Sequence, residues 1–198
     1  MIGHRDRPNG TTSSDESGVS LVELIMVMLL LSIIVGIAAP MVRPEKFQMD
    51  GGLVTVASTL TAQQRNSVLR QHNVVLAIDS ANSRIRVHYD LDNDGTVDGG
   101  ENTHVVELEE GVVFGRGVAT ARAAGGAMNT FTDTQDGMPA LTFRRNGSAS
   151  TEAILYVTSR RAATAGAYAM DTRAIEIERA TGRVRCYSFQ TESWVQTC

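Results

Sequence analysis

The most prominent pattern in the sequence is one apolar segment close to the N-terminus. Residues 1–17 are polar, whereas the 21 residues from Val19 to Ala39 include only Ser20, Glu23 and Ser32 as polar positions. As a helix this segment would be roughly 31 Å long at about 1.5 Å per residue, which matches the roughly 30 Å hydrocarbon core of a bilayer. The pattern therefore predicts a single membrane-spanning helix over residues 19–39.

A second helical pattern follows after a short polar stretch. Apolar side chains recur every three or four residues from Leu53 to about Gln71, which predicts an amphipathic helix. Its stripe comprises Leu53, Val56, Ala57, Leu60, Gln64 and Val68. Pro40, Pro44 and the pair Gly51-Gly52 favour a kink or break between the two helices. Residues 40–72 are thus predicted to form a kinked linker and an amphipathic helix.

From residue 73 onward the period changes to that of strands. Short segments rich in β-branched residues alternate with polar positions, as where Ile175 and Ile177 alternate with Glu176 and Glu178, and this favours an antiparallel sheet with one wet face. The strands are expected at 74–78, 84–89, 105–108, 112–114, 141–143, 153–157, 174–178 and 184–187. Residues 115–139 are predicted to be a long loop. The fold class is therefore α+β, with a long N-terminal helix packed on an antiparallel β-rich domain at 73–198.

Composition and charge narrow the classes of function. The length of 198 residues suits one domain plus an anchor, and the net charge of -4 favours neither a polyanion binder nor an extreme surface. The only two cysteines are Cys186 and Cys198. In an exported domain this pair could form a disulfide, whereas in a cytosolic protein two free thiols would be expected.

Glu23 is the chemical anomaly of the apolar segment. A carboxylate near the centre of a membrane helix costs on the order of 2.5–3.5 kcal/mol, and such residues usually have a function. Glu23 lies five residues after Gly18, close to one end of the segment. A free α-amino group produced by cleavage after Gly18 would supply a partner charge at that end.

At this point the segment GVSLVELIMVMLLLSIIVGIAAP resembles the class III signal of type IV prepilins and type II secretion pseudopilins. The resemblance implies that residues 1–18 are a leader, that prepilin peptidase cuts between Gly18 and Val19, and that Val19 becomes N-methylated. It makes Glu23 the assembly glutamate and Pro40 a helix-kinking proline. The sequence departs from the family in two ways. Its leader carries Arg5 and Arg7 against Asp6, Asp15 and Glu16, where leaders of the family are usually basic, and it has Val19 where phenylalanine is common.

Later segments resemble the GspH/FimT group of this superfamily. They are LTAQQRNSVLRQHNVVLAI, LTFRRNGSAS and AIEIERATGRVR. The implied function is that of a minor pseudopilin of a type II protein secretion system, anchored in the inner membrane by a single span with its C-terminal domain in the periplasm. The implied partners are prepilin peptidase and homologous subunits, with which the chain would assemble into a periplasmic pseudopilus or a surface pilus.

The segment DLDNDGTVDGGE is the strongest internal motif. It fits the calcium-loop pattern D-x-[DN]-x-[DN]-G-x5-E at every position. The candidate oxygen ligands for Ca²⁺ are Asp90, Asp92, Asp94, Thr96, Asp98 and Glu101. Because the flanking residues indicate strands rather than helices, a solvated acidic hairpin loop is the other interpretation.

The segment Gly182-Arg183-Val184-Arg185 carries an alternative function. Arg183 and Arg185 would project from one face of a strand and could form a basic patch with Arg179 and Arg173. The segment resembles the GRxR motif of FimT-like minor pilins that bind DNA for uptake in natural transformation. Ordinary solvent-facing arginines are the other interpretation, because Glu176, Glu178 and Glu192 lie close in the sequence.

Catalytic patterns are missing from the sequence. Its four histidines, His4, His72, His88 and His104, do not have metal-ligand spacing, and it contains no nucleophile elbow, P-loop or dinucleotide fingerprint. The chain is therefore predicted not to be an enzyme. The sequence leaves open whether it serves type II secretion, a type IV pilus or a competence machine.

Overall fold

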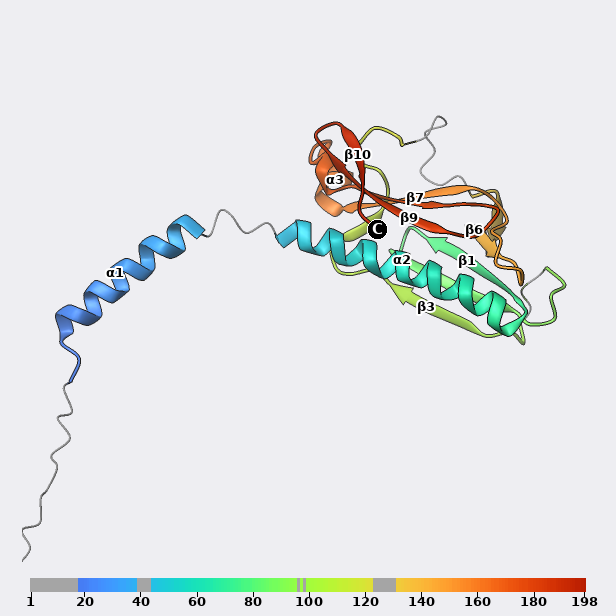
Figure 1. Ribbon diagram of the computed structural model, residues 1–198, viewed down its shortest axis with the longest axis horizontal. Coiled ribbons are helices and arrows are strands. Elements are labelled where there is room, and N and C mark those ends of the chain that lie inside the picture. Colours follow the sequence, from blue (N-terminus) through green and yellow to red (C-terminus); the bar gives the residue numbers. More distant parts are fainter. Residues whose placement is uncertain (1–17, 39–43, 96, 98, 123–130) are drawn as a thin grey trace, which may run out of the picture. The chain divides into compact units, whose positions relative to one another are not determined.

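The structure is a computed structural model that describes residues 18–38, 44–95, 97, 99–122 and 131–198 (Figure 1). By its internal contacts the chain divides into two units, Met1–Arg43 and Pro44–Cys198. The first unit contains helix α1 and the second contains every other element. Pro40 lies outside the described residues.

Helix α1 spans Leu21–Ala38, and the Leu24 amide donates a hydrogen bond to the Ser20 carbonyl at 3.1 Å. The sequence predicted a membrane-spanning helix over 19–39, but the helix begins two residues later because Ser20 is its first acceptor. Its 18 residues correspond to about 27 Å. No helix within the described parts of the chain is both long enough and apolar enough to cross a membrane.

Helix α2 spans Pro44–Arg70 and opens the second unit. Proline suits the first helical position because its missing N–H would have no partner there. The side chains that α2 buries recur every three or four residues, and they are Met49, Leu53, Val56, Leu60, Gln63 and Ser67. The amphipathic helix was therefore predicted correctly, but its expected start at Leu53 was wrong by nine residues.

The glycine pair Gly51-Gly52 lies inside α2 and does not break it. A Cβ at Gly51 would lie 2.6 Å from a carboxylate oxygen of Glu109, and one at Gly52 would lie 2.9 Å from a methyl group of Val112. The pair thus lets the helix backbone approach the chain around Val112 closely. The sequence pattern was interpreted as a breaker, whereas the pair serves packing.

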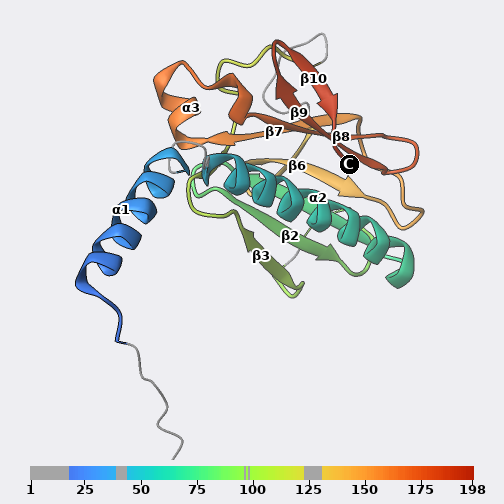
Figure 2. The same cartoon turned by 60° about the vertical axis from the view of Figure 1, so that its left-hand side comes forward.

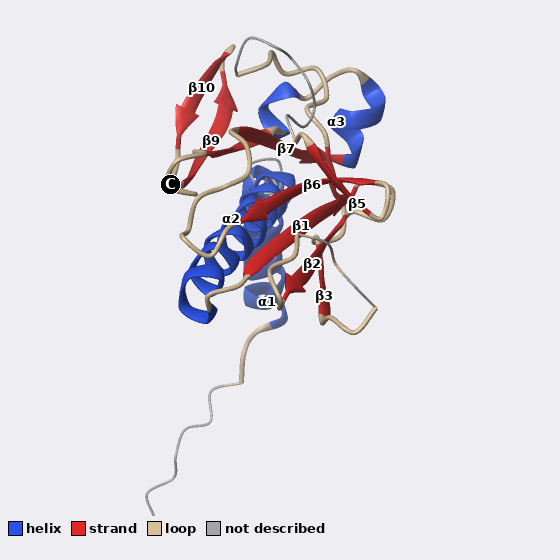
Figure 3. Cartoon of the chain, turned by 90° about the vertical axis from the view of Figure 1, so that its right-hand side faces the viewer, coloured by secondary structure: helices blue, strands red, loops and turns tan. Residues whose placement is uncertain are grey.

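Within the described residues, ten strands form two antiparallel five-stranded sheets, which Figure 3 shows as two groups of arrows. The first has the order β3-β2-β1-β6-β5 and the second the order β10-β9-β8-β7-β4. The bounds are β1 Asn73–Asp79, β2 Arg84–Asp90, β3 Thr103–Glu107, β4 Val112–Phe114, β5 Asp133–Gln135, β6 Met138–Phe143, β7 Ala153–Ser159, β8 Arg173–Ile177, β9 Val184–Gln190 and β10 Ser193–Gln196. Helix α3 (Arg160–Ala165) and the 3-10 turn η2 (Ala169–Asp171) connect β7 to β8.

One apolar core joins both sheets to α2, which runs roughly alongside strand β2 in Figure 2. Leu76 and Leu141 enter it from the first sheet, Leu155 and Ile175 from the second, and Leu60 from α2. All five are at most 1% exposed. The fold is thus α+β, as predicted, with a helix packed on antiparallel sheets.

The eight predicted strands are all present, but β5 and β10 were missed. The expected loop at 115–139 contains β5 and the first residues of β6. The two strands meet across Asp136-Gly137, both with positive φ, and Gln135 pairs with Met138. Asp-Gly is the usual signal of such a two-residue turn, so the hairpin could have been recognised from this dipeptide. The expected wet face of the sheet is also partly wrong, because the polar residue His88 of β2 is buried.

Candidate functional site

The N-terminal unit exposes its apolar side chains. The large apolar residues from Val19 to Ile37 are between 49% and 74% exposed. Its polar residues Ser32 and Glu23 differ in whether their side chains have a partner. The Ser32 hydroxyl donates to the Met28 carbonyl at 2.7 Å and is satisfied within the helix, whereas Glu23 is exposed and belongs to no ion pair among the described residues.

Gly18 and Val19 precede α1, and Glu23 lies in its first turn. A carboxylate in this position is stabilised by the partial positive charge of the helix N-terminus. The same end of the helix would carry the new α-amino group if the chain were cut after Gly18. The geometry therefore places the predicted cleavage site and the predicted assembly carboxylate within about one and a half helical turns of each other.

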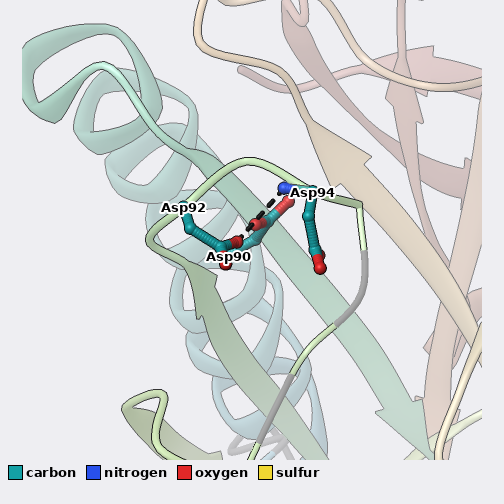
Figure 4. Close-up of side chains that lie close together, drawn as sticks. All are labelled: Asp90, Asp92 and Asp94. Atoms are coloured by element: carbon teal, nitrogen blue, oxygen red, sulfur yellow. Dashed lines mark hydrogen bonds between the residues drawn. The ribbon is translucent and has the colours of Figure 1, made fainter.

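The acidic loop lies between β2 and β3. One carboxylate oxygen from each of Asp90, Asp92 and Asp94 lies within 4.8 Å of the other two, and Figure 4 shows the three side chains gathered inside the loop. The Glu101 carboxylate accepts a hydrogen bond from the Leu91 amide at 2.6 Å, so the last residue of the motif contacts its second residue. The other two candidate ligands, Thr96 and Asp98, lie outside the described residues.

The arginines of the GRxR segment lie at the start of β9. Arg183 is exposed and just precedes the strand. Arg185 is half-buried, with its guanidinium 4.0 Å from a Glu176 oxygen and 3.9 Å from a Glu178 oxygen. These neighbours offset the positive charge of Arg185.

Arg173 contradicts the predicted basic patch. It is 3% exposed, and its guanidinium donates to Asp50 of α2 at 2.8 and 2.9 Å and to the carbonyl of Met170 at 2.8 Å. This side chain fastens α2 to β8 and is not available to a phosphate. The sequence could not place it, because its partner lies 123 residues away.

A shallow hollow of about 390 Å³ lies beside the turn between β8 and β9. It is lined by Arg144, Arg179, Glu152 and Glu178 together with Ser148, Ala149 and Ala180. Because cations and carboxylates are mixed, the hollow has no preference for an anionic ligand.

Cys186 of β9 and Cys198 are joined by a disulfide, with their Cα atoms 4.9 Å apart. The Thr197 amide donates to the Cys186 carbonyl at 2.9 Å, and Trp194 packs against Tyr156 and Phe189. The bond and these contacts hold the C-terminal strand β10 against the second sheet.

Several ionic clusters had no signal in the sequence. At the end of β7, burial opposes ionisation of Asp171, yet hydrogen bonds from Arg161 and Ser159 keep its pKa below the ordinary value. On β2, burial lowers the pKa of His88, whose ring lies 3.7 Å from an Asp136 oxygen. Such clusters depend on residues from different helices, strands and turns, so only the fold reveals them.

Asp79, at the turn between β1 and β2, carries the largest effect of this kind. Its carboxylate accepts bonds from the Asn82 side chain at 2.9 Å, from Arg84 at 2.7 Å and from Arg86 at 3.3 Å. These bonds, that from Asn82 first, lower the pKa of Asp79 from 3.8 to about 2. A carboxylate with a depressed pKa stabilises the fold above its unfolded pKa and loses that effect as pH falls.

We expect Asp79→Asn to lower the free energy of unfolding at pH 7. The deficit relative to the wild type should remain constant down to about pH 4 and shrink as the pH falls toward 2, since the wild-type carboxylate becomes protonated over this range. Urea denaturation of both proteins between pH 2 and pH 7 measures it. Glu110→Gln, which makes the same change of charge at an exposed position, is the control and should leave the free energy of unfolding at pH 7 close to that of the wild type. A deficit for Asp79→Asn that does not depend on pH would contradict this account.

No family model and no curated protein matches the sequence. Two structures of the minor pseudopilin EpsH of the Vibrio cholerae type II secretion system are similar, at 12% and 15% identity, with TM-scores of 0.46 and 0.47. The matches cover 69% and 71% of this chain and 93% and 94% of EpsH.

The type IV minor pilin FimU of Pseudomonas aeruginosa is also similar, at 12% identity and a TM-score of 0.48. That match covers 78% of this chain and 97% of FimU.

Proposed function

We propose that this chain is a minor pseudopilin of a type II protein secretion system, a structural subunit rather than a catalyst. Prepilin peptidase would remove residues 1–18 and methylate Val19. The subunit would then leave the inner membrane, where the apolar segment 19–39 holds it, and join homologous subunits in a periplasmic pseudopilus. Its β-rich unit would make the lateral contacts.

One observation carries this proposal: an exposed apolar helix, with a single carboxylate in its first turn, begins three residues after Gly18. The large apolar side chains of α1 are unfavourable in water. Each Å² of apolar surface that is removed from water contributes about 25 cal/mol of stabilisation. A membrane and a bundle of homologous helices both remove that surface from water. Glu23 suits the bundle, since the new amino group of a neighbouring subunit would pair with it.

The second unit supports the same proposal. All the clustered core residues of the described chain lie in 44–198, so this unit carries its own core. The disulfide between Cys186 and Cys198 suits an oxidising compartment such as the periplasm. A fibre subunit needs an exported domain with its own core, preceded in the chain by an apolar helix.

The DNA-binding alternative receives less support from the geometry. Arg173 is buried against Asp50, and Arg185 lies beside two glutamates. Phosphate binding depends on clustered donors whose charge is not already neutralised. We therefore propose protein subunits, and not nucleic acid, as the partners of this chain.

Processing provides the test of this proposal. When the full-length chain is produced in membranes together with an active prepilin peptidase, we expect mass spectrometry to find a mature N-terminus at N-methylated Val19. Gly18→Arg should abolish cleavage, because the bulky cation occupies the position next to the scissile bond. Gly36→Ala is the matched control, since nothing lies within 4 Å of a Cβ at Gly36, and it should be cleaved like the wild type.

An intact leader, in cells whose peptidase processes another prepilin, would refute the proposal. In the native host, deletion of the gene should abolish type II secretion and leave surface pili intact. Loss of pili with secretion retained would instead assign the subunit to a type IV pilus.

A further inference from the structure

Asp90, the last residue of β2, is a buried carboxylate that is only half satisfied. It is 1% exposed. Its Oδ2 accepts a bond from the Asn73 side chain at 2.9 Å and one from the Gly95 amide at 3.1 Å. Its Oδ1 is buried and has no hydrogen-bond partner among the residues that the structure describes. A buried acceptor without a partner costs about 1–3 kcal/mol, and more when it is charged, so such an atom indicates a missing ligand.

The surroundings of Asp90 indicate the charge of that ligand. The oxygens of Asp92 and Asp94 lie within 4.8 Å of an Asp90 oxygen, and all three side chains can carry a negative charge (Figure 4). No arginine, lysine or histidine of the described chain forms an ion pair with Asp90. Carboxylates at this separation repel one another, and a cation between them would reverse the sign of the interaction.

From the orphaned Oδ1 and the gathered carboxylates we infer that the loop between β2 and β3 binds a divalent cation, namely Ca²⁺. Oxygens that coordinate one calcium ion at 2.3–2.6 Å lie within about 5 Å of each other, which the three aspartates already satisfy. Calcium accepts six to eight oxygens in flexible geometry, whereas Mg²⁺ requires a near-ideal octahedron and retains several waters. A loop with three carboxylates in five residues therefore favours calcium.

The rest of the loop is arranged to support this site. Asn93 accepts a bond from the Asn73 amide at 2.9 Å, and the Asn73 side chain holds Asp90, so one residue of β1 positions both sides of the loop. Glu101, the last carboxylate of the motif, is held at the Leu91 amide. Bound calcium would fix the connection to β3, which is the edge strand of the first sheet.

Calcium binding to the full-length protein in detergent, freed of metal with a chelator, tests the inference. Isothermal titration with CaCl₂ should give a dissociation constant between about 10⁻⁵ and 10⁻³ M, the range of sensors and extracellular modules. At a concentration ten times the measured dissociation constant, calcium should raise the Tm by about 3–6 °C. MgCl₂ should bind at least about tenfold more weakly.

Variants locate the site. Asp92→Asn removes one exposed carboxylate and should weaken binding at least about tenfold. Asp90→Asn should abolish it, and if that variant does not fold, Asp92→Asn suffices. Glu110→Gln makes the same change of charge outside the loop and should bind like the wild type. The inference is overturned if the wild type shows no binding heat and no Tm shift in 10 mM CaCl₂ (about ten times the weakest expected constant), or if Asp92→Asn binds calcium unchanged.

Discussion

Gly182→Ala is expected to destabilise the unit formed by residues 44–198 by about 2–5 kcal/mol. Gly182 is buried and has a φ of 65°, a conformation that costs other residues about 1–2 kcal/mol. A Cβ there would collide with the Gly147 carbonyl oxygen and lie 2.9 Å from Cγ of Gln64. The Gly147 oxygen belongs to the backbone of a tight turn, so relieving the collision requires the chain to move.

Gly166→Ala is the matched control for this prediction. Gly166 has a φ of 62°, but nothing lies within 4 Å of a Cβ built on it. Gly166→Ala should therefore lower the free energy of unfolding only by the cost of the positive φ, about 1–2 kcal/mol. Urea denaturation measures the free energy of unfolding of both variants, and the difference between them gives the cost of the collision with Gly147. Equal losses of stability would show that the close approach to Gly147 has no effect.

The position of Gly182 also explains why a glycine precedes the two arginines. Gln64 of α2 donates weakly to the carbonyls of Gly147 and Thr181, at 3.3 and 3.4 Å, so the helix touches both turns at one point. Only a residue without a side chain fits between them. Gly182 thus serves packing, independently of any role of Arg183 and Arg185.

The elements that the sequence predicted well are those with a local signal. Short segments rich in β-branched residues, some of them with period-two alternation, located eight of the ten strands that the structure describes, and the three- and four-residue spacing located α2. The two missed strands are short and polar or exposed, as in β5 with Asp133, Thr134 and Gln135, where the pattern of hydrophobic residues carries no information. Their positions depend on pairing with β6 and β9 and not on their own composition.

The candidate sites divide in the same way. The sequence pattern identified Asp90, Asp92 and Asp94 because the ligands of a loop site are adjacent along the chain. It could not reveal that Asn73 holds Asp90, or that Arg173 pairs with Asp50, because these contacts span 17 and 123 residues. Two interpretations that rested on residue type alone were wrong, namely the glycine pair as a helix breaker and Arg173 as a member of the basic patch.

Replacing Glu23 with leucine is expected to abolish assembly without abolishing synthesis or cleavage of the subunit. In the proposed fibre Glu23 pairs with the α-amino group of a neighbouring Val19, which would otherwise be a charge left in apolar surroundings. Leaving one partner of a buried ion pair unmatched costs about 3–5 kcal/mol, enough to lower an association constant at least about a hundredfold. Leucine preserves the helix and its apolar surface, so cleavage after Gly18 should continue.

Sheared or crosslinked fibres from the native host, quantified against the subunit retained in membranes, measure this effect. Ser32→Ala is the matched control: it also removes a polar group from α1, but one whose hydroxyl is satisfied by the Met28 carbonyl of its own helix. It should assemble like the wild type, and Glu23→Asp should recover part of the loss because it restores the charge. Assembly of Glu23→Leu at the wild-type level would mean that the carboxylate has no partner in the fibre. The first turn of α1 would then serve only to bury apolar surface, and the register of neighbouring subunits would have to be set by the β-rich unit.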